Sequence, residues 1–214
     1  MPSIDELEIA DEPARWAALG FAVQERQVQI GTVRLRLAGQ AAGSGITGWS
    51  LRGIASTELD GLPTRSSCSE QPASAPAHPN GVVAIDHVVV FSPQLDRTIA
   101  ALRSAGLDLR RVREEPTPAG APRQAFFRLG EVILEVVQAP AEIVERGGGA
   151  SRPARLWGLA LLAEDLESTA ARLGEHCGEI RAAVQRGRQI ATVRRSAGLA
   201  VAVALMSPEP AHAA

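Results

Sequence analysis

Two ionisable side chains lie inside apolar segments of the chain. His87 occurs in AIDHVVVF, residues 84–91, and Glu135 occurs in EVILEVV, residues 131–137. A carboxylate in a strand interior must be paired, hydrated or protonated, so Glu135 requires a partner. An imidazole and a carboxylate on neighbouring strands can bind a divalent metal ion. Without a metal, the same pair can act as a general base.

Both residues also have structural interpretations. A single histidine on a half-buried strand is commonly a hydrogen-bonded structural residue. Glu135 could form a salt bridge with Arg123 or Arg128, or a hydrogen bond with His87 itself. The sequence leaves these alternatives open.

The elements that must position these residues recur along the chain. Three segments, residues 1–56, 81–140 and 155–207, each have an apolar strand, an alanine-rich helix and a glycine-centred hairpin. The same order of elements in each segment indicates internal repetition. Residues 57–80 are rich in Ser, Pro and Ala, have no periodicity, and are expected to be a linker or a long surface loop. Residues 208–214 are expected to be a frayed tail.

The helix and hairpin of the second segment have specific signals. Ser92 is a good N-cap residue, Pro93 suits a first helical turn, and Gly106 is placed to end the helix. A two-residue turn at Gly130 and Glu131 would pair two apolar strands. One face of that hairpin is wholly apolar and should pack on the helix: Ala125, Phe127, Leu129, Val132, Leu134 and Val136. The other face is a candidate ligand surface: Gln124, Phe126, Arg128, Ile133, Glu135 and Val137.

Alternation along residues 84–91 predicts which side chains accompany His87. A regular strand places Ile85, His87 and Val89 on one face, and Val88 and Val90 on the other. If the strands of His87 and Glu135 belong to one curved sheet, both side chains can point into its concave side.

The order strand, helix, hairpin, with IDHVVV and VILEVV at its two ends, resembles the vicinal oxygen chelate superfamily. This group includes glyoxalase I, bleomycin-resistance proteins, extradiol dioxygenases and fosfomycin-resistance enzymes. The resemblance implies an α+β fold of repeated βαβββ modules, whose curved mixed sheets form a cup with helices outside. It also implies a divalent metal, held in the metalloenzymes by a first-strand His or Gln and a last-strand Glu from paired modules.

Carried onto this chain, the resemblance assigns His87 and Glu135 as metal ligands and catalytic residues. The corresponding positions of the third segment are Gly158 and Val203, neither of which can bind a metal. Those of the first segment are Glu6 and Arg36, which would pair with each other. Pairing of the first and second modules would instead offer Glu6, His87 and Glu135 as ligands.

Further residues are candidates for contact with a small molecule. Phe126 and Trp157 could line the cup, although aromatic residues near strands are commonly core. Gln124 and Gln189 occupy matching places in RQAFF and RQIAT, and Arg128 lies on the ligand face. Arg110, Arg111 and Arg113 are interpreted as a solvated strand edge. His78, His176 and His212 fall in expected loops or the tail and receive no role.

Composition excludes several classes of function. The chain of 214 residues has a net charge of −2, which gives no sign of a nucleic-acid or membrane surface. Its basic residues are all arginine and it has no tyrosine, so a Schiff-base lysine and a tyrosine acid are excluded. Two cysteines and an acidic N-terminus without a long apolar run favour a cytoplasmic protein. Abundant Ala, Gly and Pro are typical of a GC-rich bacterial genome.

We therefore expect residues 81–207 to form the complete cup from modules 81–140 and 155–207. The degenerate module 1–56 would cap it or mediate a homodimer. One functional hypothesis is a lyase, isomerase or dioxygenase in which His87 and Glu135 hold Zn, Ni, Mn or Fe. The alternative is a metal-free protein that sequesters a small organic molecule, as bleomycin-resistance proteins do. A third hypothesis is a structural or regulatory module with a vestigial pocket.

Overall fold

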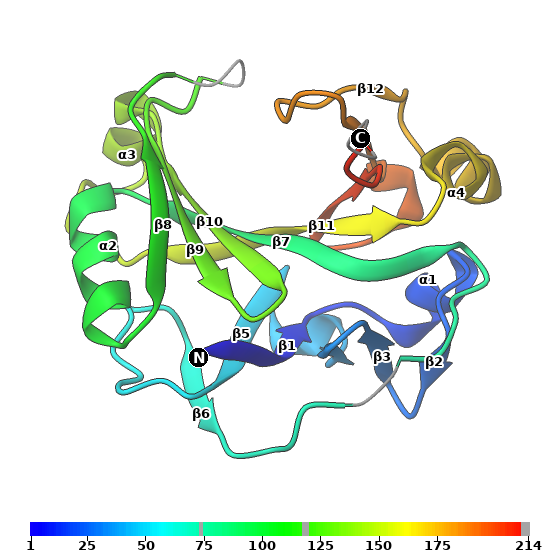
Figure 1. Ribbon diagram of the computed structural model, residues 1–214, viewed down its shortest axis with the longest axis horizontal. Helices are drawn as coiled ribbons and strands as arrows, with labels where there is room; N and C mark the ends of the chain where they lie inside the picture. Colours follow the sequence, from blue (N-terminus) through cyan, green and yellow to red (C-terminus); the bar gives the residue numbers. More distant parts are fainter. Residues whose placement is uncertain (73–74, 117–119, 211–214) are drawn as a thin grey trace.

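The computed structural model describes residues 1–72, 75–116 and 120–210 and contains two mixed β-sheets flanked by short helices (Figure 1). The fold is α+β, as predicted, and consists of βαβββ modules. No helix in these ranges combines the length and the apolar character needed to cross a bilayer.

The larger sheet combines the second and third modules. The second comprises β7 (Val82–Ser92), α2 (Leu95–Ser104), β8 (Asp108–Arg113), β9 (Gln124–Leu129) and β10 (Val132–Gln138). The third comprises β11 (Arg155–Ala163), α4 (Leu166–Leu173), β12 (Arg181–Ala182), β13 (Gln189–Thr192) and β14 (Ala202–Met206). The eight strands run in the order β12-β13-β14-β11-β7-β10-β9-β8, so the first strands of the two modules meet at the centre. A short helix, α3 (Ala141–Arg146), lies between the modules.

The smaller sheet begins with a module of the same design. It comprises β1 (Ser3–Ile9), α1 (Pro13–Ala18), β2 (Val23–Gln24), β3 (Gln27–Ile30) and β4 (Val33–Leu37). The order β2-β3-β4-β1 matches β8-β9-β10-β7, and β4 is parallel to β1 just as β10 is parallel to β7. Three single-turn 3₁₀ helices, at 40–42, 174–176 and 195–197, complete the elements.

Two further strands extend this sheet where a partner module would lie. β5 (Ile46–Arg52) is antiparallel to β1, as β11 is to β7. β6 (Thr64–Ser67) is parallel to β5, as β14 is to β11. β6 lies within residues 57–80, which were expected to have no regular structure, so this strand is a correction. The division of the chain into domains stays a prediction.

One hydrophobic core joins the two sheets. From the smaller sheet it includes Leu7, Leu35 and Trp49, and from the larger sheet Val88 and Phe127, all fully buried. The apolar face of the first module therefore covers the back of the larger sheet, and strands of the two sheets lie side by side in Figure 1. This packing leaves the opposite, concave face of the larger sheet open for a ligand.

The hairpin of the second module has the predicted register, but the start of its helix differs. Leu129 pairs with Val132 and Phe126 with Glu135, around Gly130 at φ 64°. Ser92 is not the N-cap of α2. Its hydroxyl accepts a hydrogen bond from the Gln94 N–H (3.0 Å) and bonds the Thr98 hydroxyl (2.6 Å), tying the strand end to the helix.

Candidate functional site

A cavity of about 2010 Å³, the cup, follows the concave face of the larger sheet and reaches the β3–β4 turn of the first module. It exceeds the roughly 300–1,000 Å³ of common ligand pockets, so a small molecule would fill only part of it. Six predicted site residues line it: His87, Glu135, Gln124, Phe126, Arg128 and Trp157. Gln189 is exposed on β13 and does not line the cup, although its neighbours Arg188 and Ile190 do.

A β-bulge in β7 adds an acidic residue that alternation did not predict. Ile85 pairs with Leu161 and His87 with Ala160, so two steps along β7 correspond to one step along β11. A bulge of this kind redirects a side chain. Asp86 and His87 consequently both line the cup; Ile85 also borders it but is buried in the core. Alternation had not placed Asp86 on this face.

Asp86 holds the imidazole of His87 in one orientation. The Asp86 carboxylate accepts a hydrogen bond from His87 Nδ1 (2.7 Å) and pairs with the Arg188 guanidinium (2.6 Å). Burial alone would raise the pKa of Asp86, but the hydrogen bonds from His87 and Arg188 lower it below the ordinary value. Since an ionised carboxylate only accepts hydrogen bonds, Nδ1 carries the proton and Nε2 faces away from Asp86.

Glu135 completes a chain of interacting groups. One carboxylate oxygen lies 3.4 Å from Nε2 of His87, and the other accepts a hydrogen bond from the side-chain amide of Gln124. Burial raises the pKa of Glu135, although attraction to His87 and the bond from Gln124 oppose the rise. Of the partners considered from the sequence, His87 is the one observed; Arg123 pairs instead with Glu114 (2.6 Å).

Two buried polar atoms beside Glu135 have no hydrogen-bond partner within the described chain. They are the amide oxygen of Gln124 and Nε of Arg113. Arg113 and Gln124 lie opposite each other on β8 and β9, and both line the cup. A buried donor or acceptor without a partner is costly, and such atoms mark where a ligand or water would bind.

The register corrects the last-strand position expected in the third module. In the second module, Glu135 pairs with Val89, which lies two residues after His87. In the third module, the residue two positions after Gly158 pairs with Ala204, and Val203 is buried in the core. The expected position was wrong by one residue, and alanine likewise offers no metal ligand.

The first-strand position, Gly158, cannot gain a ligand either. A Cβ atom there would lie 2.7 Å from the carbonyl oxygen of Ala202, closer than such contacts allow. Among the residues that the structure describes, no group of three or more His, Cys, Asp or Glu could hold a metal. His87 and Glu135 alone do not fit a resident divalent ion, which generally has about three protein ligands.

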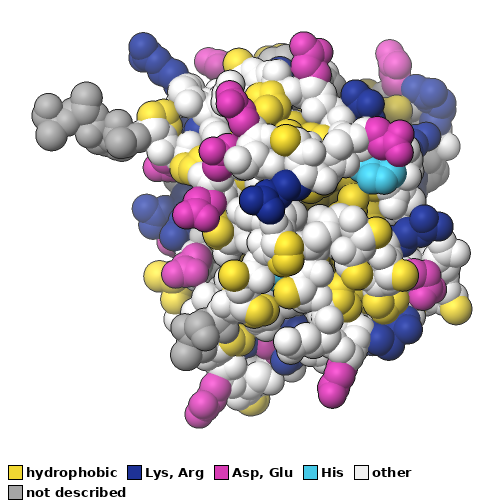
Figure 2. All heavy atoms as spheres, turned by 90° about the vertical axis from the view of Figure 1, so that its right-hand side faces the viewer, with side chains coloured by type: hydrophobic (Ala, Val, Ile, Leu, Met, Phe, Trp, Pro, Cys, Tyr) yellow, Lys and Arg dark blue, Asp and Glu magenta, His cyan; other side chains and the backbone are white. Residues whose placement is uncertain are grey.

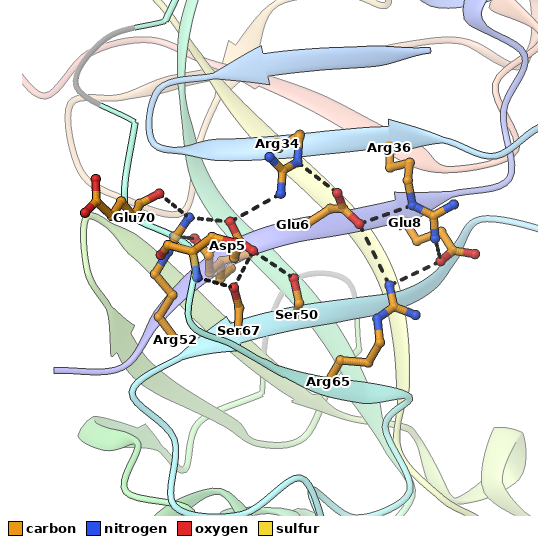
Figure 3. Close-up of polar contacts among 12 residues, drawn as sticks. Asp5, Glu6, Glu8, Arg34, Arg36, Ser50, Arg52, Arg65, Ser67 and Glu70 are labelled. Atoms are coloured by element: carbon orange, nitrogen blue, oxygen red, sulfur yellow. Dashed lines mark hydrogen bonds and ion pairs between the residues drawn. The ribbon is translucent and has the colours of Figure 1, made fainter. Parts of the chain in front are cut away.

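In the first module the equivalent place is filled by ion pairs (Figure 3). Glu6 pairs with Arg36 (3.2 Å), as predicted, and also with Arg34 (2.8 Å). Buried Asp5 pairs with Arg52 and accepts a hydrogen bond from the Ser67 hydroxyl (2.6 Å). Glu6 is thus held in the smaller sheet, and the alternative in which it joins His87 and Glu135 is wrong.

Comparison with known proteins agrees with this architecture. The model of the Glyoxalase/Bleomycin resistance protein/Dioxygenase superfamily matches residues 84–193, about half of the chain. The chain belongs to this superfamily. No curated protein matches this chain significantly in sequence.

Solved structures show how much of the fold is shared. A variant of 4-hydroxymandelate synthase from Streptomyces coelicolor aligns with a TM-score of 0.65 at 13% identity, covering 99% of this chain and 94% of that one. A fusion of a xylose isomerase-like TIM barrel with 4-hydroxyphenylpyruvate dioxygenase gives 0.61 at 13% identity, covering 99% and 49%. Methylmalonyl-CoA epimerase from Mycobacterium tuberculosis gives 0.49 at 18% identity, covering 65% and 93%. At 13% identity, the first two likenesses show the fold alone.

Proposed function

We propose that the cup binds a small organic molecule and that His87 and Glu135 transfer a proton to or from it. The observation that carries this proposal is the oriented imidazole. Asp86 fixes Nδ1, and Nε2 lies 3.4 Å from Glu135 within the cup. The reaction class is an isomerase or lyase step that begins by removing a proton next to a carbonyl group.

The residues have distinct roles in such a step. Nε2 of His87 accepts the proton, and the negative charge of Asp86 stabilises the imidazolium that forms. Glu135, whose pKa is raised by burial, is suited to return a proton to the substrate.

The proposal is independent of a bound metal. His87 and Glu135 supply two side-chain ligands, and the closed backbone at Gly158 excludes a third from β11. The metal-dependent dioxygenase hypothesis is therefore the less supported one.

A second candidate is sequestration of a ligand without chemistry. An aromatic wall favours it: the tilted rings of Phe91 and Trp157 lie with centroids 4.9 Å apart, and Phe126 lines the same cup. Such surfaces bind apolar molecules in the absence of catalytic groups.

Solvent deuterium exchange tests the proposal without knowledge of the product. The protein would be incubated in D₂O with a panel of small carbonyl compounds that carry an α proton, and exchange followed by proton NMR. We expect catalysed exchange with at least one compound, reduced roughly 100-fold or more in His87→Ala and Glu135→Gln. His176→Ala, at a half-buried histidine of the third module that does not line the cup, is the matched control.

Two results would redirect the assignment. Binding of panel compounds without exchange would support sequestration. Near-stoichiometric metal by elemental analysis, lost in His87→Ala, would instead establish a metal site.

A further inference from the structure

The cup is rich in arginine although the whole chain has a net charge of −2. Nine of its described lining residues are arginines: Arg111, Arg113, Arg128, Arg155, Arg181, Arg186, Arg188, Arg194 and Arg195. Five are acidic: Asp86, Glu115, Glu131, Glu135 and Glu209. By contrast, the face of the molecule seen in Figure 2 mixes charges of both signs. The concave surface thus concentrates positive charge where a ligand would enter.

Most arginines of the cup form no ion pair with a carboxylate of the described chain, although the charge of Arg113 acts on Glu135. Within the described ranges, Arg188 is the one cup arginine that pairs with a carboxylate, that of Asp86. The corresponding face of the smaller sheet behaves differently, because Arg34, Arg36 and Arg52 all form ion pairs there (Figure 3). The contrast indicates that the arginines of the cup are available to an anion from outside the chain.

Arg113 is the cup arginine best placed to act with the candidate catalytic pair. It lies on β8, opposite Gln124, and Gln124 donates a hydrogen bond to Glu135. Its Nε is buried and has no acceptor in the part of the chain that the structure describes. Arg111, two residues earlier on β8, lines the same wall.

We infer that the ligand of the cup is a small organic acid whose carboxylate is bound by Arg113. A guanidinium presents parallel N–H donors that match the two oxygens of a carboxylate. The aromatic wall at Phe91, Phe126 and Trp157 suits an apolar body on the same molecule. This inference rests on the cup as the site of the proposed function and names its substrate class.

Binding of a matched acid and amide tests the charge requirement. Phenylacetate and phenylacetamide, which differ only in that group, would be titrated into the wild type by calorimetry, with inorganic phosphate as a third probe. We expect the acid to bind at least about tenfold more tightly than the amide, and to weaken as salt is added. If inorganic phosphate binds more tightly than phenylacetate, the ligand of the cup carries a phosphate group and not a carboxylate, and the acid assignment is overturned.

Variants of two arginines on one strand locate the contact. Arg113→Gln should weaken phenylacetate binding about tenfold or more. The matched control is Arg110→Gln, because Arg110 is exposed on the same strand and pairs with Asp108 (3.0 Å). Arg113→Lys keeps the positive charge but lacks the paired N–H donors of the guanidinium, so its affinity for phenylacetate should be intermediate. This variant also controls for a folding defect of the glutamine variant.

The outcomes separate this inference from the proposed chemistry. Equal affinity for acid and amide, no acid binding at millimolar concentration, or equal binding by the two glutamine variants would overturn it. His87→Ala should retain acid binding while losing deuterium exchange. Acid binding through Arg113 with no exchange of any compound would leave the inference standing and reject the proton-transfer function.

Discussion

Glu6 occupies the same place in the smaller sheet that His87 occupies in the larger one. Each follows an aspartate in a bulged first strand, in the sequences IDE and IDH. Glu6 lies opposite Arg34 of the last strand, and His87 lies opposite Ile133. One scaffold position thus supports a closed ion-pair network in one module and an open candidate site in the other.

The two aspartates make the comparison more specific. Asp5 bonds an arginine of β5, and Asp86 bonds Arg188 just before β13. In the first module the arginines of the face neutralise Glu6 and Glu8, so no group remains to bind a ligand. In the second module the imidazole replaces one of these carboxylates, which leaves a group that can transfer a proton.

Asp86→Asn tests whether Asp86 orients the catalytic imidazole. The amide preserves the shape of the side chain but removes the charge that stabilises the imidazolium. We expect deuterium exchange to fall by about 100-fold or more while the affinity for phenylacetate changes little. Rates and affinities would be measured on the same preparations. Parallel losses of both would show that Asp86 has only a structural role.

Glu135→Gln should stabilise the protein at neutral pH. Burial raises the pKa of Glu135 in the folded state, so the native protein holds this proton more tightly than the unfolded chain. Stability is therefore lost as pH rises through the ordinary value of 4.5 towards the raised pKa. The glutamine removes this loss and keeps an acceptor for Gln124. Denaturation in urea at pH 7 and near pH 4.5 should show the gain only at pH 7; a gain of equal size at both would contradict this origin.

The sequence was sufficient to predict the modules and the hairpin because their signals are local. Alternation and the Gly130 turn specify which residues pair, and the register agreed. The bulge at Asp86 was not predictable, because it depends on the spacing of a partner strand more than 70 residues away. The ion pair of Asp86 with Arg188 followed from the same long-range geometry. Arg111 and Arg113 were interpreted as a strand edge; β8 is an edge strand, yet both residues line the cup.

The role of His78 was also not apparent from its loop sequence. It is buried, with Nδ1 accepting the Ala22 N–H (3.1 Å) and Nε2 bonded to the Gln29 carbonyl (3.0 Å). His176 is half-buried, and its Nδ1 lies 3.2 Å from the Ser196 hydroxyl. His212 lies outside the described residues.

Removing one partner of the Asp5–Arg52 pair should be strongly destabilising. Asp5 is 4% exposed, and Arg52→Met would leave this buried carboxylate with only the longer ion pair to Arg34 (3.6 Å). The expected loss in the free energy of unfolding is about 2–3 kcal/mol, because the remaining charge is only partly compensated. Arg65→Met is the control: its side chain is 56% exposed and its pairing with Glu8 (3.3 Å) should contribute less than about 1 kcal/mol. Similar losses in the two variants, measured by urea denaturation, would contradict the ranking.

His78 should make stability depend on pH. Burial lowers the pKa of His78, so the unfolded chain takes up this proton more readily than the folded one. Its contribution is complete above the ordinary value of 6.5 and is lost as pH falls below that value towards the lowered pKa. The loss of stability between pH 7.5 and pH 5.5 should be smaller in His78→Gln than in the wild type. His176→Gln should retain the wild-type slope, and an equal reduction in both variants would exclude His78 as the source.

Gly158→His tests whether the missing metal ligand can be restored. A side chain at Gly158 could add a third metal ligand to His87 and Glu135. However, a Cβ atom at this position would lie 2.7 Å from the Ala202 carbonyl oxygen. Because that oxygen belongs to the backbone of β14, the strands must separate to accept any side chain. We expect a lower free energy of unfolding and no stoichiometric zinc by calorimetry. A stable variant that binds zinc through His87, Glu135 and the new imidazole would show that the cup needs only one substitution to become a metal site.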